Sequence, residues 1–222
     1  MMKVEIWSDV MCPFCYIGKR KFEKALSQFD DKNNIEIEWK SFQLDATIES
    51  QPNKTINEYL AERKGISAER AKQMNDHVTQ MAAAEGLEYH LDKAVVANSF
   101  DAHQFVQFAK TKNKGNEAEE ALFKAYFTDS KNISNHNLLL ELAASIDLNT
   151  DELKNALQQN LFADKVKQDI YEASQIGVSG VPFFVFDNKY AVSGAQPSET
   201  FLQALQHSFN EHKIANNKIT TP

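Results

Sequence analysis

The sequence predicts an α/β fold in which a long helical segment interrupts a small mixed sheet. Two alternating apolar and polar runs near the N-terminus flank a segment with helical periodicity. Between about residues 55 and 175 the pattern is helical throughout, and strand patterns return only after Gly177. This order is typical of a chain whose sheet is completed after an insertion.

The N-terminal segment predicts a strand–helix–strand unit. Residues 3–8 alternate as a strand does, and Pro13 ends that pattern. From Phe14 to Phe29 apolar residues recur at three- to five-residue steps, which predicts a helix that ends at the polar stretch 30–34. A second alternating run covers residues 35–40. The two strands can pair in parallel through a right-handed crossover.

The middle of the chain carries helix start signals instead of strand patterns. Candidate starts are Thr55, Ser67, Asn98, Ser134 and Thr150. We therefore expect an all-helical segment inserted between the second and third strands.

The C-terminal segment predicts a hairpin and a last helix. Residues 182–186 are strand-like, Asp187 and Asn188 suit a turn, and a short strand follows over 189–193. Ser198 is a candidate cap for the last helix. This order of elements predicts a thioredoxin-like fold formed by residues 1–54 and 176–213, with a helical subdomain over 55–175 and a polar tail over 214–222.

Composition excludes several functional classes. The 222 residues are 42% hydrophobic and 25% charged, which is usual for a globular protein. A net charge of -7 without basic clusters argues against nucleic acid as a partner. The apolar runs are too short to span a membrane, and the N-terminus shows no apolar signal region. We expect a cytoplasmic protein without a membrane partner.

The only two cysteines, Cys12 and Cys15, form a CxxC motif at the predicted strand-to-helix junction. With Cys12 as N-cap and Pro13 as the first helical residue, backbone amides and the helix dipole favour a thiolate at Cys12. We therefore predict Cys12 as the attacking sulfur and Cys15 as the resolving thiol. The alternative is a zinc site, which needs about four ligands. With no second CxxC and six scattered histidines, we expect neither a metal nor another cofactor.

Pro182 opens the predicted third strand, and a bend at this position favours a cis Val181–Pro182 bond. A cis bond would leave the Val181 backbone beside the cysteines, able to pair with a substrate peptide. The alternative is a trans proline that simply starts the strand. In the same way, Asp9 could act as an acid or base but more simply closes a turn.

The candidate substrate-binding residues are Pro13, Phe14, Val181, Pro182 and His103. His103 could face a substrate groove and assist proton transfer, although a lone histidine between aromatic residues is more often structural. Phe14, Tyr16 and Phe183 could form an apolar rim, although such residues are core by default.

Two long motifs resemble one known family. The segments Ser8-Asp9-Val10-Met11-Cys12-Pro13-Phe14-Cys15-Tyr16-Ile17-Gly18-Lys19 and Gly177-Val178-Ser179-Gly180-Val181-Pro182-Phe183-Phe184-Val185 are similar to those of the DsbA family, specifically its cytoplasmic FrnE-like branch. Gly194-Ala195-Gln196 and Asn98-Ser99-Phe100-Asp101-Ala102-His103 also resemble family elements.

The resemblance implies a thiol–disulfide oxidoreductase or isomerase. It also implies a cis Pro182 packed against the cysteine pair and a helical insertion that forms one wall of the substrate groove. The partners would be disulfide- or thiol-containing proteins, or small thiols such as glutathione. One residue departs from the family's periplasmic oxidants, which usually carry Pro-His between the cysteines, because Phe14 cannot donate to a thiolate. We therefore expect a milder redox couple than that of a strong oxidant.

Two other functions remain open at this point. Relatives of this branch include kappa-class glutathione transferases and hydroxychromene-carboxylate isomerases, so a glutathione-dependent transferase or isomerase is the first alternative. Those relatives typically place Ser at the position of Cys12, which disfavours it. The second is a chaperone-like binding module in which the thiols are incidental.

Overall fold

The computed structural model describes residues 1–219, except for the side chains of residues 52, 53 and 216–219. The first 55 residues form β1 (Met2–Ser8), α1 (Pro13–Ser27), a short turn η1 (Lys32–Asn34), β2 (Ile35–Ser41) and β3 (Gln51–Thr55). The middle of the chain forms α2 (Ile56–Lys64), α3 (Ala68–Ala84), β4 (Val95–Val96), α4 (Phe100–Lys110), α5 (Gly115–Phe123), a π-helical turn η2 (Lys124–Thr128), α6 (His136–Ser145), α7 (Thr150–Gln158) and α8 (Ala163–Gln175). The chain ends with β5 (Phe183–Phe186), β6 (Tyr190–Ser193) and α9 (Ser198–Ile219).

The main sheet has the strand order β2-β1-β5-β6. β1 and β2 are parallel, as the strand–helix–strand pattern predicts, and run in register from the Met2–Ile35 pair to the Ser8–Ser41 pair. β5 pairs antiparallel with β1, and β6 pairs antiparallel with β5. The hairpin turns through Asp187 and Asn188, which both have positive φ. The two halves of the sheet thus come from opposite ends of the chain.

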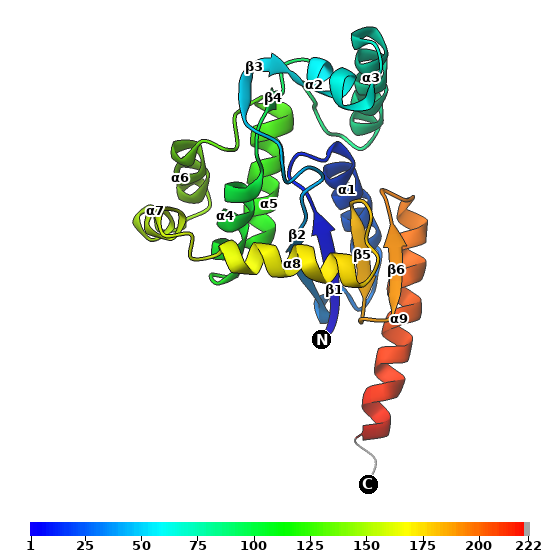
Figure 1. The fold of residues 1–222 in the computed structure, drawn as a ribbon. Coiled ribbons are helices and arrows are strands. Elements are labelled where there is room, and N and C mark those ends of the chain that lie inside the picture. Colours follow the sequence, from blue (N-terminus) through cyan, green and yellow to red (C-terminus); the bar gives the residue numbers. More distant parts are fainter. Residues whose placement is uncertain (220–222) are drawn as a thin grey trace.

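Alternation along the strands gives the sheet two apolar faces. On one face Phe184 packs against Phe22 of α1 and Phe201 of α9, all buried. On the other face Trp7 and Phe183 pack with Ala173 of α8. Figure 1 shows α8 crossing β1 and β2, with α1 and α9 on the opposite side of the sheet. This layering holds the start of α1 at one end of the sheet.

The insertion is mostly helical, with one correction to the all-helical prediction. β3 and β4 pair as a separate two-stranded sheet. The middle segment carries helix start signals, and a two-residue strand such as β4 is too short to show the alternation that predicts a strand. Beyond this small sheet, the hairpin of α2 and α3 lies over the end of the molecule where α1 begins (Figure 1).

Helix starts follow the predicted caps with small shifts. Thr55 forms a capping box with Glu58, and Ser67 caps α3. The later starts differ by one residue, because Asn135 and Asn149 accept the capping bonds in place of Ser134 and Thr150. α9 continues to Ile219, through most of the predicted polar tail, and residues 220–222 lie outside the described part of the chain.

Candidate active site

Cys12 is the N-cap of α1, as predicted, and Pro13 occupies the first turn. The Cys12 backbone N–H donates to the Asp9 carbonyl oxygen at 2.8 Å, and the Cys15 N–H donates to the Cys12 carbonyl oxygen at 2.9 Å. These bonds hold the Cys12 side chain at the positive end of the helix. Backbone N–H groups and the helix dipole make such a position electropositive.

The long-range partner of Cys12 comes from the other end of the chain. Its Sγ lies 3.4 Å from the Val181 carbonyl oxygen. The Val181–Pro182 peptide bond is cis, and Pro182 is buried. Gly18 allows this close approach, because a Cβ there would lie 2.8 Å from Cγ of Pro182. The structure thus brings together Cys12, Val181 and Pro182, which the sequence separates by about 170 residues.

Cys15 lies one turn further along α1 and is shielded. It is 1% exposed, and no disulfide joins it to Cys12 in the structure. Burial raises the pKa of the Cys15 thiol well above its ordinary value, and the neighbouring Cys12 adds to that rise. Ser8 and the Asp9 backbone act in the opposite direction. Cys15 is therefore suited to react with the Cys12 sulfur of a mixed disulfide rather than with a substrate in solution.

Stacked aromatic rings pack against the first turn of α1. Tyr16, Phe123, Tyr89 and Phe127 stack on one another, with centroids 4.7 Å apart for the Tyr89–Phe127 pair and 4.9 Å apart for the Tyr16–Phe123 pair. The Tyr89 hydroxyl donates to the Pro13 carbonyl oxygen at 2.8 Å. This contact links the cysteine loop to the inserted segment.

The predicted apolar rim is correct only for Phe14, which is 38% exposed. Tyr16 is buried, and its hydroxyl donates to Glu120 at 2.6 Å. Phe183 packs with Trp7 on the sheet face covered by α8. Sequence reasoning could not separate these three because all of them are aromatic residues beside the two motifs.

A buried acid–base cluster lies behind the cysteine loop. The Asp9 carboxylate accepts the Met11 N–H at 3.1 Å and the Leu44 N–H at 2.8 Å, so it closes the turn and also ties two loops together. His103 is fully buried and does not face a groove, which corrects the substrate-binding role considered for it. Its Nε2 lies 3.7 Å from Asp9, too far for a hydrogen bond. Neither of its ring nitrogens has a hydrogen-bond partner among the described residues.

Glu119 of α5 completes this cluster and was missed in the sequence. It is 1% exposed, and its Oε2 has no partner within the described residues. Burial raises the pKa of Glu119 to about 7. Burial lowers the pKa of His103, but the Asp9 and Glu119 carboxylates raise it by more, so the net shift is upward. The available signal was a charged residue at helical spacing from Leu122 and Phe123, on the apolar face of its helix.

A cavity of about 680 Å³ opens beside Cys12. The cysteine loop forms one side of it, and α2 and α3 form the opposite wall. The lining is mainly apolar, and it includes the predicted residues Pro13 and Phe14. The sequence predicted a helical wall but not which helices would form it, because α2 and α3 reach the cysteines only through tertiary packing.

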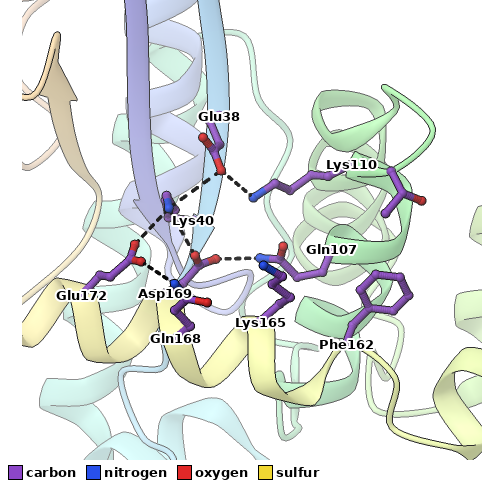
Figure 2. A pocket seen from close by; sticks show the side chains of 10 residues that line it. Glu38, Lys40, Gln107, Lys110, Phe162, Lys165, Gln168, Asp169 and Glu172 are labelled. Atoms are coloured by element: carbon purple, nitrogen blue, oxygen red, sulfur yellow. Dashed lines mark hydrogen bonds and ion pairs between the residues drawn. The ribbon is translucent and has the colours of Figure 1, made fainter.

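A second, smaller cavity lies between β2, α4 and α8 (Figure 2). Its centre is the Asp169 carboxylate, which accepts the Ser41 N–H at 2.9 Å and the Gln107 side chain at 2.6 Å. Lys40 lies 3.4 Å from Asp169 and 3.0 Å from Glu172. This cavity contains neither cysteine. Its polar groups hold the insertion against the sheet.

The described residues offer neither a metal site nor a membrane-spanning helix. Over residues 1–219, no cluster of three or more His, Cys, Asp or Glu side chains is arranged to hold a metal ion. No helix in the same range has the length and apolarity needed to cross a bilayer.

Comparison with solved structures finds the same fold in several other proteins. A probable DsbA oxidoreductase from Streptomyces coelicolor superimposes with a TM-score of 0.89 at 38% identity, over 95% of this chain and 91% of its own. The cytosolic disulfide reductase DsbM from Pseudomonas aeruginosa, solved with glutathione, has a TM-score of 0.66 at 15% identity, over 94% of this chain and 99% of its own. The second likeness shows the fold alone.

Sequence comparison agrees with the structural one. The uncharacterised protein YwbO from Bacillus subtilis is 27% identical over 207 residues, which cover 91% of this chain and 94% of that protein. The model of the DSBA-like thioredoxin domain matches residues 3–206, which include both cysteines and Pro182. The chain therefore belongs to the DSBA-like thioredoxin domain family.

Proposed function

We propose that this protein is a thiol–disulfide oxidoreductase that exchanges a Cys12–Cys15 dithiol or disulfide with protein or small-molecule substrates. The observation that carries the proposal is the asymmetry of the pair. Both thiols are largely buried, at 3% and 1% exposed, but Cys12 caps α1 and lines the cavity, whereas Cys15 lies one turn behind it and does not line it. One sulfur can meet a substrate and the other can only meet Cys12.

The reduction of a substrate disulfide follows from this arrangement. The Cys12 thiolate attacks one substrate sulfur, so that a mixed disulfide forms and the other substrate sulfur leaves as a thiolate. Cys15 then loses its proton and attacks the Cys12 sulfur, which releases the second substrate thiolate. The Cys12–Cys15 dithiol has then given two electrons to the substrate and become a disulfide, and the two leaving thiolates take up the two protons that the cysteines lost. The reverse sequence oxidises a substrate dithiol.

The experiment compares wild type with Cys12→Ser and Cys15→Ser. Wild type should reduce insulin disulfides with dithiothreitol as electron donor, and Cys12→Ser should lose this activity. Cys15→Ser should accumulate a mixed disulfide at Cys12, detected by mass spectrometry, because the resolving step is blocked. Retention of insulin reduction by Cys12→Ser would contradict the proposal. Glutathione transfer retained by that variant would favour the transferase or isomerase alternative.

Phe14 supports a mild redox couple within the same proposal. Its exposed phenyl ring offers no hydrogen-bond donor to the Cys12 sulfur. The reduced form then gains less stabilisation than in DsbA, whose potential is about -120 mV. Equilibration with glutathione buffers should give a potential well below that value. A potential near that of DsbA would contradict this part of the proposal.

We also propose that the protein works in the cytoplasm, where such a dithiol is kept reduced and can donate electrons. The cytosolic reductase of similar fold supports this compartment. Trapping of the redox state in intact cells should find Cys12 and Cys15 mostly as thiols. A fully oxidised pair would contradict the assignment.

A further inference from the structure

Exposed apolar side chains gather around the cavity beside Cys12. Phe14, Leu44 and Met74 are 38%, 47% and 38% exposed, and all three line it. Among the described residues, the other exposed large apolar side chains are Met1, Leu161, Tyr171, Ile176 and Ile214, none of which lines this cavity. Single exposed apolar residues are ordinary on a protein surface, but a concave group of them marks a binding site.

The wall opposite Cys12 includes α2, a helix without a fully buried side chain. No described residue of α2 is buried. Its apolar side chains Ile56, Tyr59 and Leu60 line the cavity, and they remain half-buried. Val78 of α3 and Phe127 close the cavity further in. This apolar surface faces space that a ligand can fill, and the volume of about 680 Å³ lies within the usual range for small-molecule sites.

Two cations and two carboxylates line the cavity, together with His77. The cations are Arg63 and Lys64, and the carboxylates are Asp45 and the buried Asp9, which already accepts two backbone N–H groups. Asp45 is already occupied, because it pairs with Arg63 and accepts the Tyr59 hydroxyl at 2.6 Å. Lys64 and His77 make no ion pair among the described residues. A chain of net charge -7 therefore presents an unpaired cation, Lys64, in the cavity that Cys12 also lines.

We propose that this cavity selects the substrate, and that it takes low-molecular-weight disulfides or thiols with an apolar, ring-sized body and an anionic group. The apolar body would lie between α2 and Phe14, with its sulfur at Cys12 and its anionic group near Lys64. Glutathione offers no apolar body to fill the cavity. This inference rests on the proposed disulfide exchange and specifies its substrate class.

The test measures oxidation of the reduced protein by a panel of disulfides. The panel contains dithiodibenzoate (aromatic and anionic), dithiodipyridine (aromatic and neutral), cystamine (aliphatic and cationic), oxidised glutathione and insulin. Each rate is divided by that of the same disulfide with free dithiothreitol, which removes intrinsic reactivity. From the apolar area that one ring buries, we expect dithiodibenzoate to exceed cystamine and oxidised glutathione by roughly thirtyfold in normalised rate. Dithiodipyridine should fall between them.

Variants locate the selectivity in the cavity. Met74→Glu places a charge on the exposed apolar wall and should lower the ratio of dithiodibenzoate to cystamine roughly tenfold. Lys64→Glu, at an exposed site that cannot affect folding through burial, should lower the same ratio. The matched control Leu161→Glu changes a residue that is 55% exposed and outside the cavity, and it should leave the ratio unchanged.

The outcomes separate this inference from the proposed function. Equal normalised rates for all small disulfides would overturn the substrate class while exchange itself stands. A higher normalised rate for insulin than for dithiodibenzoate would overturn it in favour of protein substrates. Absence of exchange with every disulfide would instead contradict the proposed function.

Discussion

Asp169 and Glu119 are both buried carboxylates in the insertion, and their surroundings differ. Asp169 accepts two hydrogen bonds and lies 3.4 Å from Lys40 (Figure 2). Glu119 leaves one oxygen without a partner and has His103, also unpartnered, as a titratable neighbour. A buried carboxylate with hydrogen-bond partners stabilises a fold. One without partners costs free energy, so its presence calls for an explanation other than stability. The unsatisfied cluster is the one that borders the cysteine loop.

The largest effect should come from removing the satisfied carboxylate. Asp169→Ala leaves the Ser41 N–H and the Gln107 side chain without their acceptor and weakens the ion pairing of Lys40. We expect a loss of roughly 3 to 5 kcal/mol in the free energy of unfolding, measured with urea. The control Asp164→Ala removes an exposed carboxylate from the same helix and should change little. A small loss in Asp169→Ala would mean that the cluster is not structural.

Glu119→Gln should instead raise the free energy of unfolding, and only at higher pH. Burial raises the pKa of Glu119 from 4.5 to about 7, so between these values the folded protein holds a proton that the unfolded chain has released. Stability from this group therefore falls as pH rises through that window. At about pH 8 the variant should be more stable than wild type by up to roughly 3 kcal/mol, with no difference near pH 4.

Urea titrations across this pH range test the prediction. The matched control Glu117→Gln, exposed on the same helix, should give curves parallel to wild type. Parallel curves for Glu119→Gln as well would show that its carboxyl group is not held protonated by burial.

Gly18→Ala should lower the free energy of unfolding by an intermediate amount, because Gly18 packs closely against Pro182. The added Cβ would lie 2.8 Å from Cγ of the buried Pro182. We expect a loss of roughly 1 to 3 kcal/mol, together with slower exchange as Val181 moves away from Cys12. Gly180→Ala is the control, since a Cβ there meets no atom within 4 Å. Unchanged stability and exchange rate in Gly18→Ala would contradict this packing argument.

Lys165→Ala should have the smallest effect. Lys165 lines the cavity of Figure 2 but makes no ion pair among the described residues. We expect a change within about 0.5 kcal/mol in the free energy of unfolding. A larger destabilisation would show that this lysine belongs to the Asp169 cluster.

Much of the fold could be predicted because its signals are local. Alternation in residues 3–8 and 35–40 predicted two paired strands, and the structure confirms their parallel register. The N-cap position of Cys12 followed from the proline after it. The small β3–β4 sheet and the length of α9 were missed, because short strands lack periodicity and polar residues at a helix end do not by themselves stop the helix.

The candidate site also has a part that local sequence signals predict and a part that depends on tertiary packing. The sequence alone determined the cysteine pair and its place at a helix N-terminus, because the spacing of Cys12 and Cys15 and the helix that begins between them are local properties. Only tertiary structure decided that His103 is buried against Asp9, that Glu119 joins them, and that α2 forms a cavity wall. These contacts join segments tens of residues apart, and their geometry depends on how whole helices pack, which no short-range pattern records.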